Sequence, residues 1–415
     1  MRKHLVVVSL LLTIAACAPK EATVSGDGGE AAPEPIKIGE YSALTGLTAT
    51  FGQSSHNGIR IAVDEINAAG GVKGRPIKLL TEDTQSKPQE AANAVQKLIS
   101  QDEVVAVLGE VASSRTLAAA PIAQQAKVPM ISPSSTNPKV TEIGDYIFRI
   151  NYIDPFQGLA GANFMVQHLG LTRAAILRDV KNDYSVGLAE FFQQTLEELG
   201  GEVVIDQSYA EGDSDFRSQL TAIKATNAQV IYVPGYYTEI GQIARQSRDL
   251  GINLAFLGGD GWESPKLIEI GGEALEGSFY TNAFYAEDPR PEARTFVKKY
   301  NEKFGVTPDA LAALAYDAAH VLFDAMKRAE SLDPTAIRDA IATVADFNGV
   351  TGVITIGPDR NAIKPIVVLG VKGGTIALEV TVHPDGRIEK PGEAEETSDS
   401  DAEIESPDPL DPSIP

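Results

Sequence analysis

Short apolar runs alternate with longer amphipathic stretches through most of this chain, and this alternation restricts its fold more than any other feature. The apolar runs that we predict to be strands are 36–42, 76–83, 104–109, 128–133, 174–179, 203–210, 230–236 and 255–260. The helices predicted between them are 53–69, 88–101, 113–126, 185–199, 214–226 and 238–250. Continuous apolar strands separated by helices indicate parallel sheets that are covered on both faces. The chain is therefore predicted to be an α/β protein.

The number of strands and the length of the chain together predict two lobes rather than one sheet. Eight strands are predicted by residue 260 alone, an open sheet of ten or more is unusual, and 415 residues exceed what one hydrophobic core normally supports. The predicted fold is thus two doubly wound α/β lobes. Open α/β sheets bind ligands at the carboxyl ends of their strands. The residues that follow each strand are therefore the first candidates for a binding site.

The composition argues against several other classes of protein. The 57 acidic and 35 basic residues give a net charge of −22, which disfavours nucleic acid and anionic membrane surfaces as partners. One cysteine and five isolated histidines do not match the spacing of a metal site, so no metal or cofactor is predicted. The sequence holds no nucleophile elbow, phosphate-binding loop or dinucleotide-binding glycine motif. We predict a binding protein; a lipid-anchored enzyme is the alternative from another class, which steady turnover of a substrate would reveal.

The two ends of the chain are typical of targeting and solvated segments. Residues 1–17 combine two early basic residues, a short apolar run and a final cysteine, as in a bacterial lipoprotein signal peptide. The signal peptide would export the protein, and lipidation of Cys17 would anchor it, facing the periplasm or the cell surface; a free buried cysteine is the alternative. Residues 18–35 are a predicted flexible linker. Residues 386–415 are a predicted acidic, disordered tail.

Hydroxyl, phenol and carboxyl side chains follow five of the predicted strands. The candidates are Ser113, Ser134, Thr136, Tyr184, Tyr236 and Asp260. The start of a helix at Ser113 suits a ligand carboxylate, and Asp260 suits a ligand ammonium. Each feature also has an ordinary interpretation. Ser113 would cap its own helix, the serine cluster before Pro138 would form a turn, Asp260 would be a turn residue among glycines, and the tyrosines would be surface residues.

Four segments of the chain resemble one protein family. They are YSALTGLTATFGQSSHNGIRIAVDEINAAGGVKGRPIKLL, VVAVLGEVASSRTLAAAPIAQQAKVPMISPSST, YVPGYYTEIGQIARQSRDLG and FLGGDGWESP. They resemble the leucine/isoleucine/valine-type solute-binding proteins of ABC importers, and the match covers residue 36 to about residue 385. The resemblance implies a Venus-flytrap fold, with the ligand between two lobes and three crossovers forming the hinge. It implies that lobe one comprises 36–152 and 284–349, and lobe two 153–283 and 350–385.

The resemblance implies a role for each candidate of lobe one. Ser113 would bind the α-carboxylate of an amino acid, and Thr136 would meet both α-groups. Ser134 would contribute backbone atoms to the ligand. The aromatic ring of Phe51 would wall the side-chain pocket together with Trp262, which follows Asp260.

In lobe two, the resemblance implies that Tyr184 and Tyr236 meet the ligand and that Asp260 holds its α-ammonium. Many family members carry glutamate at the position of Asp260. The shorter aspartate therefore requires a closer approach of the ammonium or a bridging water. Many members also have a disulfide in lobe one, which a chain with a single cysteine does not form.

The function that this resemblance implies is capture of a branched-chain or other apolar amino acid by a lipid-anchored monomer. The ligand would then be delivered to an ABC permease in the membrane. A tethered sensor or receptor for an amino acid, an amide or a short carboxylate is the alternative use of the same fold. Neighbouring permease and ATPase genes would favour transport, and a neighbouring kinase gene would favour sensing. The sequence leaves open the side-chain preference and the membrane that carries the anchor.

Overall fold

The computed structural model describes residues 33–392. The predicted signal peptide, the lipidation site Cys17 and nearly all of the predicted linker lie outside the described residues, and so do residues 393–415 of the predicted acidic tail. Among the residues that are described, no helix has the length and apolar character needed to cross a membrane.

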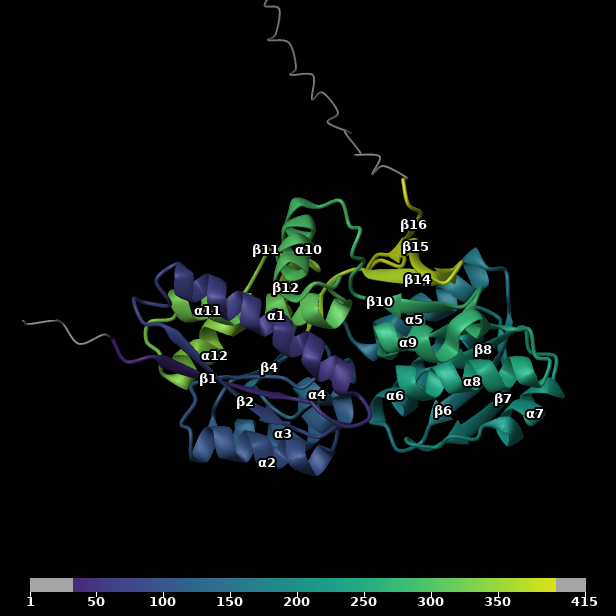
Figure 1. Cartoon of the computed structure of the whole chain (residues 1–415), viewed down its shortest axis with the longest axis horizontal. Helices are drawn as coiled ribbons and strands as arrows, with labels where there is room; N and C mark the ends of the chain where they lie inside the picture. The colour runs from purple at the N-terminus through teal and green to yellow at the C-terminus, as the bar shows by residue number, and fades with distance from the viewer. Residues whose placement is uncertain (1–32, 393–415) are drawn as a thin grey trace, which may run out of the picture. The chain divides into compact units, whose positions relative to one another are not determined.

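The first lobe is built on a five-stranded parallel sheet with the order β2-β1-β3-β4-β5. Its strands are β1 (Ile36–Ser42), β2 (Ile77–Asp83), β3 (Val107–Leu108), β4 (Met130–Ser132) and β5 (Ile147–Arg149). The helices from the N-terminal half are α1 (Ala49–Ala68), α2 (Pro88–Ser100), α3 (Ser113–Ala126) and α4 (Lys139–Glu142). Three more come from far along the chain: α10 (Pro291–Phe304), α11 (Ala310–Arg328) and α12 (Pro334–Ala342). In Figure 1 the purple α1 and the green α11 accordingly lie side by side.

Both faces of this sheet are covered, as the continuous apolar strands predict. Successive side chains of a strand point to opposite faces, and in β3 they enter different cores. Val107 belongs to the core formed with α2 and α3, whereas Leu108 belongs to the core formed with α1 and α11. A strand that is buried on both faces therefore has a continuous apolar sequence.

In helix α1 the local sequence accounts for both the buried face and the C-terminal end of the helix. Its buried face includes Ile59, Ala62, Val63 and Ile66, which recur with the period of a helix. The helix ends after Ala68, and Gly70 follows with a φ of +93°, a conformation that glycine adopts without steric cost. The helix begins at Ala49, four residues before the predicted start at 53, so that Phe51 lies in its first turn.

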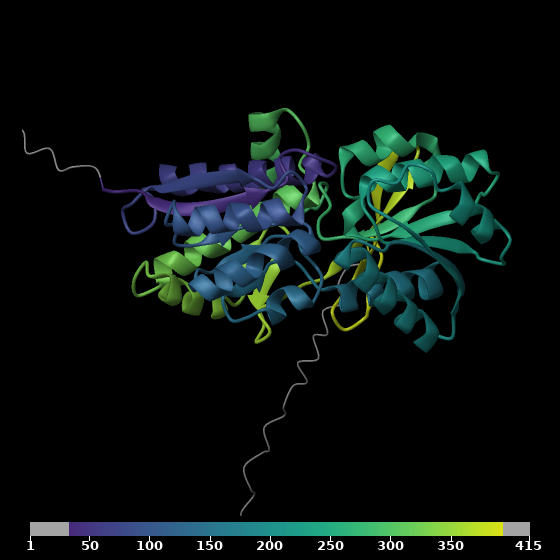
Figure 2. The ribbon, with the colours of Figure 1, turned by 90° about the horizontal axis from the view of Figure 1, so that it is seen from below.

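The second lobe is built on an eight-stranded sheet with the order β16-β15-β14-β10-β9-β8-β6-β7. Its strands are β6 (Arg173–Asp179), β7 (Glu202–Tyr209), β8 (Val230–Val233), β9 (Ala255–Gly258), β10 (Phe279–Asn282), β14 (Ile366–Lys372), β15 (Thr375–Val382) and β16 (Ile388–Glu389). Its helices are α5 (Asp154–Asn163), η1 (Phe164–His168), α6 (Asp183–Glu198), α7 (Arg217–Lys224), α8 (Tyr237–Asp249), η2 (Asp260–Trp262), α9 (Pro265–Gly271) and η3 (Gly272–Leu275). Figure 2 shows helices above and below the central strands of this lobe.

The end of the chain departs from two predictions. The sheet of the second lobe is mixed rather than fully parallel, because β14, β15 and β16 join its edge in antiparallel register. The predicted disordered tail starts too early at 386, since β16 pairs with β15 through Thr381–Glu389 and Val382–Ile388. Tight turns join these last strands, whereas parallel neighbours need a crossover of a dozen or more residues.

Three segments connect the two sheets: 150–153 between β5 and α5, 283–290 between β10 and α10, and 364–365 before β14. The third connection lies later than predicted. The strands β11 (Phe347–Gly349), β12 (Gly352–Ile356) and β13 (Ala362–Ile363) form a small antiparallel sheet. The predicted boundary between 349 and 350 is therefore wrong, because it falls inside the β11–β12 hairpin.

Candidate functional site

A small cavity lies at the carboxyl ends of strands from both sheets. Seven of the eight residues predicted from the sequence line it. The ten lining residues are Phe51, Val111, Ser113, Ser134, Thr136, Tyr184, Tyr236, Asp260, Gly261 and Leu311.

Ser113 is the first residue of α3, and it does not cap that helix. The N-cap residue is Ala112, whose side chain makes no capping hydrogen bond. The Ser113 hydroxyl instead accepts a hydrogen bond from the backbone N–H of Asn137, at 3.2 Å. The interpretation of Ser113 as a helix cap is therefore wrong. Since the first N–H groups of a helix lack intrahelical partners, the start of α3 offers donors for an anion at the cavity.

The segment after β4 presents alternate side chains to the cavity. Ser134 and Thr136 line it, whereas Ser135 points into the protein. The Ser135 hydroxyl contacts the backbone oxygens of Glu110 and Val111, each at 3.0 Å. This anchoring explains the Ser-x-Thr spacing, because the middle residue fixes the segment while its neighbours remain available to a ligand.

Asp260 is a buried carboxylate of the second lobe, 7% exposed. Its Oδ1 accepts a hydrogen bond from Nε2 of Gln157 at 2.9 Å, and its Oδ2 accepts one from Nδ2 of Asn151 at 3.2 Å. Burial raises the pKa of Asp260 to about 6, and these neutral donors oppose the rise. No ion pair to Asp260 comes from the described part of the chain. The arrangement suits a cationic ligand group.

Tyr184 and Tyr236 form an aromatic wall of the cavity. Their rings are stacked, with centroids 5.7 Å apart and planes inclined by 8°. The ring of Phe51, from the first lobe, meets Tyr236 edge to face at 5.3 Å. Burial raises the pKa of both tyrosine hydroxyls, so both are neutral at physiological pH. The Tyr184 hydroxyl accepts a hydrogen bond from the backbone N–H of Gly261, at 3.1 Å.

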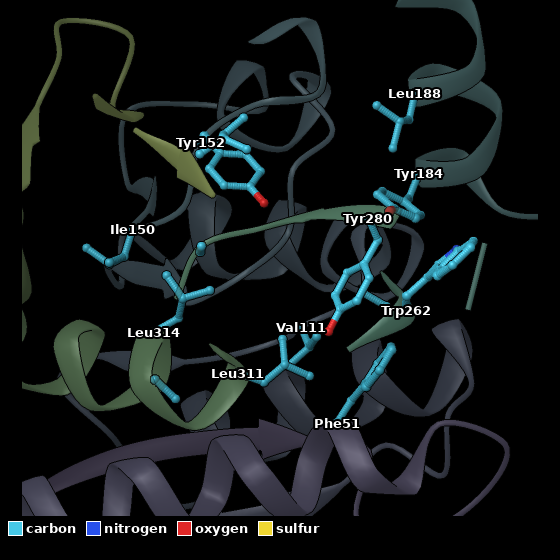
Figure 3. Close-up of a cluster of buried hydrophobic side chains, with 14 of the residues drawn as sticks. Phe51, Val111, Ile150, Tyr152, Tyr184, Leu188, Trp262, Tyr280, Leu311 and Leu314 are labelled. Atoms are coloured by element: carbon cyan, nitrogen blue, oxygen red, sulfur yellow. The ribbon is translucent and has the colours of Figure 1, made fainter. Parts of the chain in front are cut away.

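Three lining residues are missed by reasoning from the sequence. Val111 and Leu311 join Phe51 to make one end of the cavity apolar, and Figure 3 shows these three side chains close together. Gly261 contributes backbone, and a Cβ there would lie 2.5 Å from the carbonyl oxygen of Gly235. Val111 lies two residues from the predicted Ser113, so a wider window would have included it. Leu311 lies on α11, and no local signal connects it to the site.

Trp262 does not line the cavity, and its predicted role in the side-chain pocket is wrong. Its side chain is fully buried, and the indole N–H donates to the backbone oxygen of Val233 at 2.9 Å. The ring stacks on Tyr280 at 5.8 Å. The strand end therefore directs Asp260 toward the cavity and directs Trp262, two residues later, into the core of the second lobe.

The two lobes, the hinge segments and the strand-end cavity define a two-lobed solute-binding protein. The chain belongs to the periplasmic binding protein family, whose model matches residues 35–375. This family consists of solute-binding proteins rather than enzymes. The resemblance to the leucine/isoleucine/valine-type solute-binding proteins and the predicted Venus-flytrap fold are both confirmed.

Several known proteins are similar to this chain. A leucine-specific-binding protein of Salmonella typhimurium is 32% identical over 316 residues, which cover 75% of this chain and 85% of that protein. The crystal structure of a leucine-binding protein of Thermotoga maritima is 44% identical with a TM-score of 0.82, and covers 84% of this chain and 99% of its own. A branched-chain amino acid transporter substrate-binding protein of Streptococcus pneumoniae, solved in complex with isoleucine, is 34% identical with a TM-score of 0.80. That match covers 86% of this chain and 100% of the other.

Proposed function

We propose that this protein captures a free α-amino acid with an apolar side chain and delivers it to an ABC permease. One observation carries the proposal: a buried carboxylate, a helix start with free N–H groups and an apolar end share one small cavity. Asp260 supplies the carboxylate, Ser113 begins the helix, and Leu311 lies at the apolar end. An α-amino acid presents the three complementary groups on neighbouring atoms.

The lining residues assign an orientation to this ligand. Its ammonium would pair with Asp260, which has no cationic partner among the described residues. Its carboxylate would accept hydrogen bonds from Ser113, Thr136 and the start of α3. Its side chain would contact Phe51 and Leu311. The leucine and isoleucine named for the relatives support an apolar preference.

The expected affinity follows from the contacts that a buried ligand would make in the cavity. A hydrogen bond that involves a charged group contributes about 1.5–3 kcal/mol, and the ligand would make several. Part of that gain offsets the loss of translational freedom. A micromolar Kd corresponds to about −8 kcal/mol, which the ion pair, the hydroxyl contacts and the apolar end would together supply.

We propose that closure of the two lobes encloses the ligand and creates the form that the permease recognises. Direct contacts between the lobes support this. The backbone N–H of Asp183 donates to Oγ of Ser114 at 3.0 Å, and Nδ2 of Asn137 donates to the Asp183 carbonyl at 2.9 Å. The hydroxyls of Thr50 and Ser264 lie 3.0 Å apart. A ligand that contacts both lobes shifts the population toward this form.

Export and anchoring through a lipid on Cys17 belong to the same proposal. The lipobox-like end of the signal sequence supports this anchor, and periplasmic membership of the family agrees with export. We further propose that the protein acts as a monomer and that it binds its solute without chemical turnover.

A thermal-shift screen against the twenty L-amino acids, simple amides and short carboxylates tests the proposal. A ligand at a thousand times its Kd stabilises the native state by about 4 kcal/mol. We expect a rise in melting temperature with apolar amino acids, and its loss in Asp260→Asn. A shift with carboxylates or amides alone, and none with amino acids, would exclude the proposed ammonium pairing.

A further inference from the structure

The segment that first connects the two lobes also contacts the carboxylate of Asp260. Asn151 lies on this segment, and Gln157 follows in the first turns of α5; both side chains are fully buried. Nε2 of Gln157 donates to Asp260 Oδ1 and to the hydroxyl of Thr281, both at 2.9 Å. Nδ2 of Asn151 donates to Asp260 Oδ2 at 3.2 Å. Each carboxylate oxygen thus has one amide donor, from the connecting segment or from the first turn of α5.

The same segment contacts the opposite wall of the cavity. Nδ2 of Asn151 also donates to the backbone oxygen of Ser134, at 3.3 Å. The backbone N–H of Asp154 donates to the carbonyl of Thr136 at 2.9 Å. Ser134 and Thr136 belong to the first lobe, and Asp260 belongs to the second. The segment therefore holds ligand-facing residues of both lobes.

Burial raises the pKa of Asp260, and hydrogen bonding opposes this rise: Gln157 contributes most, followed by the Tyr184 hydroxyl, the backbone and Asn151. The titratable groups that face Asp260 are Asp154, Tyr152, Tyr184 and Tyr232. Burial raises the pKa of Asp154 to about 8, although Arg149 opposes this, so Asp154 is largely neutral at pH 7. Burial also raises the pKa of the three tyrosines, which are therefore neutral.

We propose that Asn151 and Gln157 are positioning residues for ligand binding. They fix the Asp260 carboxylate in the orientation that meets the ligand ammonium and keep it ionised at neutral pH, and Asn151 ties this carboxylate to the Ser134 segment when the lobes close. The inference rests on the proposed function, because it assumes an ammonium at Asp260. It adds to the site one residue of the connecting segment and one of α5, neither of which lines the cavity.

The test substitutes Gln157→Met, which keeps the size of the side chain and removes the donor. The Kd of the amino acid found in the screen is measured by calorimetry between pH 5 and pH 8.5, on the full chain. The loss of one hydrogen bond to a charged group predicts binding about ten to a hundred times weaker at pH 7. The pH below which affinity declines should rise from about 6 by about one unit.

The control is Tyr152→Phe on the same connecting segment. The Tyr152 hydroxyl is buried without a hydrogen-bond partner in the structure, so its removal should leave the pH profile unchanged. If Gln157→Met does not fold, Asn151→Ser repeats the test on the other carboxylate oxygen.

Two results would overturn the proposal: unchanged affinity in a folded variant, or affinity reduced equally at every pH. The second result would mean that these residues support the fold alone. Failure of the proposed function is distinguishable, because the wild-type protein would then bind no amino acid. In that case the pKa of Asp260 is measured by ¹³C NMR titration of its carboxyl group in the ligand-free protein. Gln157→Met should still raise this pKa, and an unchanged pKa would show that Gln157 does not support the charge of Asp260.

Discussion

The substitution Asp260→Asn should stabilise the ligand-free protein while it abolishes amino acid binding. In the folded protein, burial raises the pKa of Asp260 from 3.8 to about 6. A difference of about two units, at 1.36 kcal/mol each, means that the ionised carboxylate costs about 3 kcal/mol of folding free energy at neutral pH. A neutral asparagine removes this cost.

Part of the gain is lost again through hydrogen bonding. The asparagine amide nitrogen does not accept from Gln157 or Asn151, so one of the two contacts to the carboxylate disappears. A typical hydrogen bond contributes about 1 kcal/mol, which leaves a net stabilisation of about 1–2 kcal/mol. At about 2–4 °C per kcal/mol for a domain of this size, the melting temperature should rise by a few degrees.

The sign of the pH dependence is fixed by the direction of the shift. Since the folded pKa of Asp260, about 6, lies above the unfolded value, the cost is fully present above pH 6 and vanishes below about pH 4. The variant should therefore be more stable than the wild type at pH 7.5, and equal or less stable at pH 4.

The assay is urea denaturation of both proteins at these two pH values. Bound solute is first removed by unfolding in guanidinium and refolding under dialysis. Asp249→Asn, which changes an exposed acid of α8, is the matched control. An Asp260→Asn variant that is no more stable at pH 7.5, or whose difference from wild type does not change with pH, would refute the assigned burial cost.

Three further predictions follow from other contacts. Gly261→Ala should abolish binding, because its Cβ would lie 2.5 Å from the carbonyl oxygen of Gly235. The Kd for the ligand of the wild-type protein is measured by calorimetry, and an unchanged Kd would contradict this prediction. Arg115→Met should destabilise the protein by about 3–5 kcal/mol in urea denaturation, since it leaves the buried Glu110 carboxylate without its ion-pair partner at 2.8 Å. A decrease in the free energy of unfolding of less than about 1 kcal/mol would contradict the prediction for Arg115→Met. Cys17→Ser should move the protein from the membrane fraction to the soluble fraction on cell fractionation, and retention on the membrane would argue against the lipid anchor.

Local patterns in the sequence determined the fold class and most of the cavity. Apolar strands with helices between them predict sheets covered on both faces, and the rule that ligands bind at strand ends selects the residues after each strand. Ser113, Ser134, Tyr184 and Asp260 were found in this way, because the distance from a strand end to its following side chains is fixed by a few residues of chain.

The tertiary structure alone decided the contacts between distant segments. Leu311 reaches the cavity because α11 packs along α1, and Asn151 meets Asp260 because it lies on a segment that connects the two lobes. Trp262 shows the converse: its position after a strand predicts a pocket wall, yet its indole N–H is satisfied by Val233 in the core. The number of residues between a strand end and a given residue fixes where the backbone of that residue lies. Which of its neighbours it contacts depends on packing between segments that are far apart in the sequence, and that packing leaves no periodic signal in the sequence.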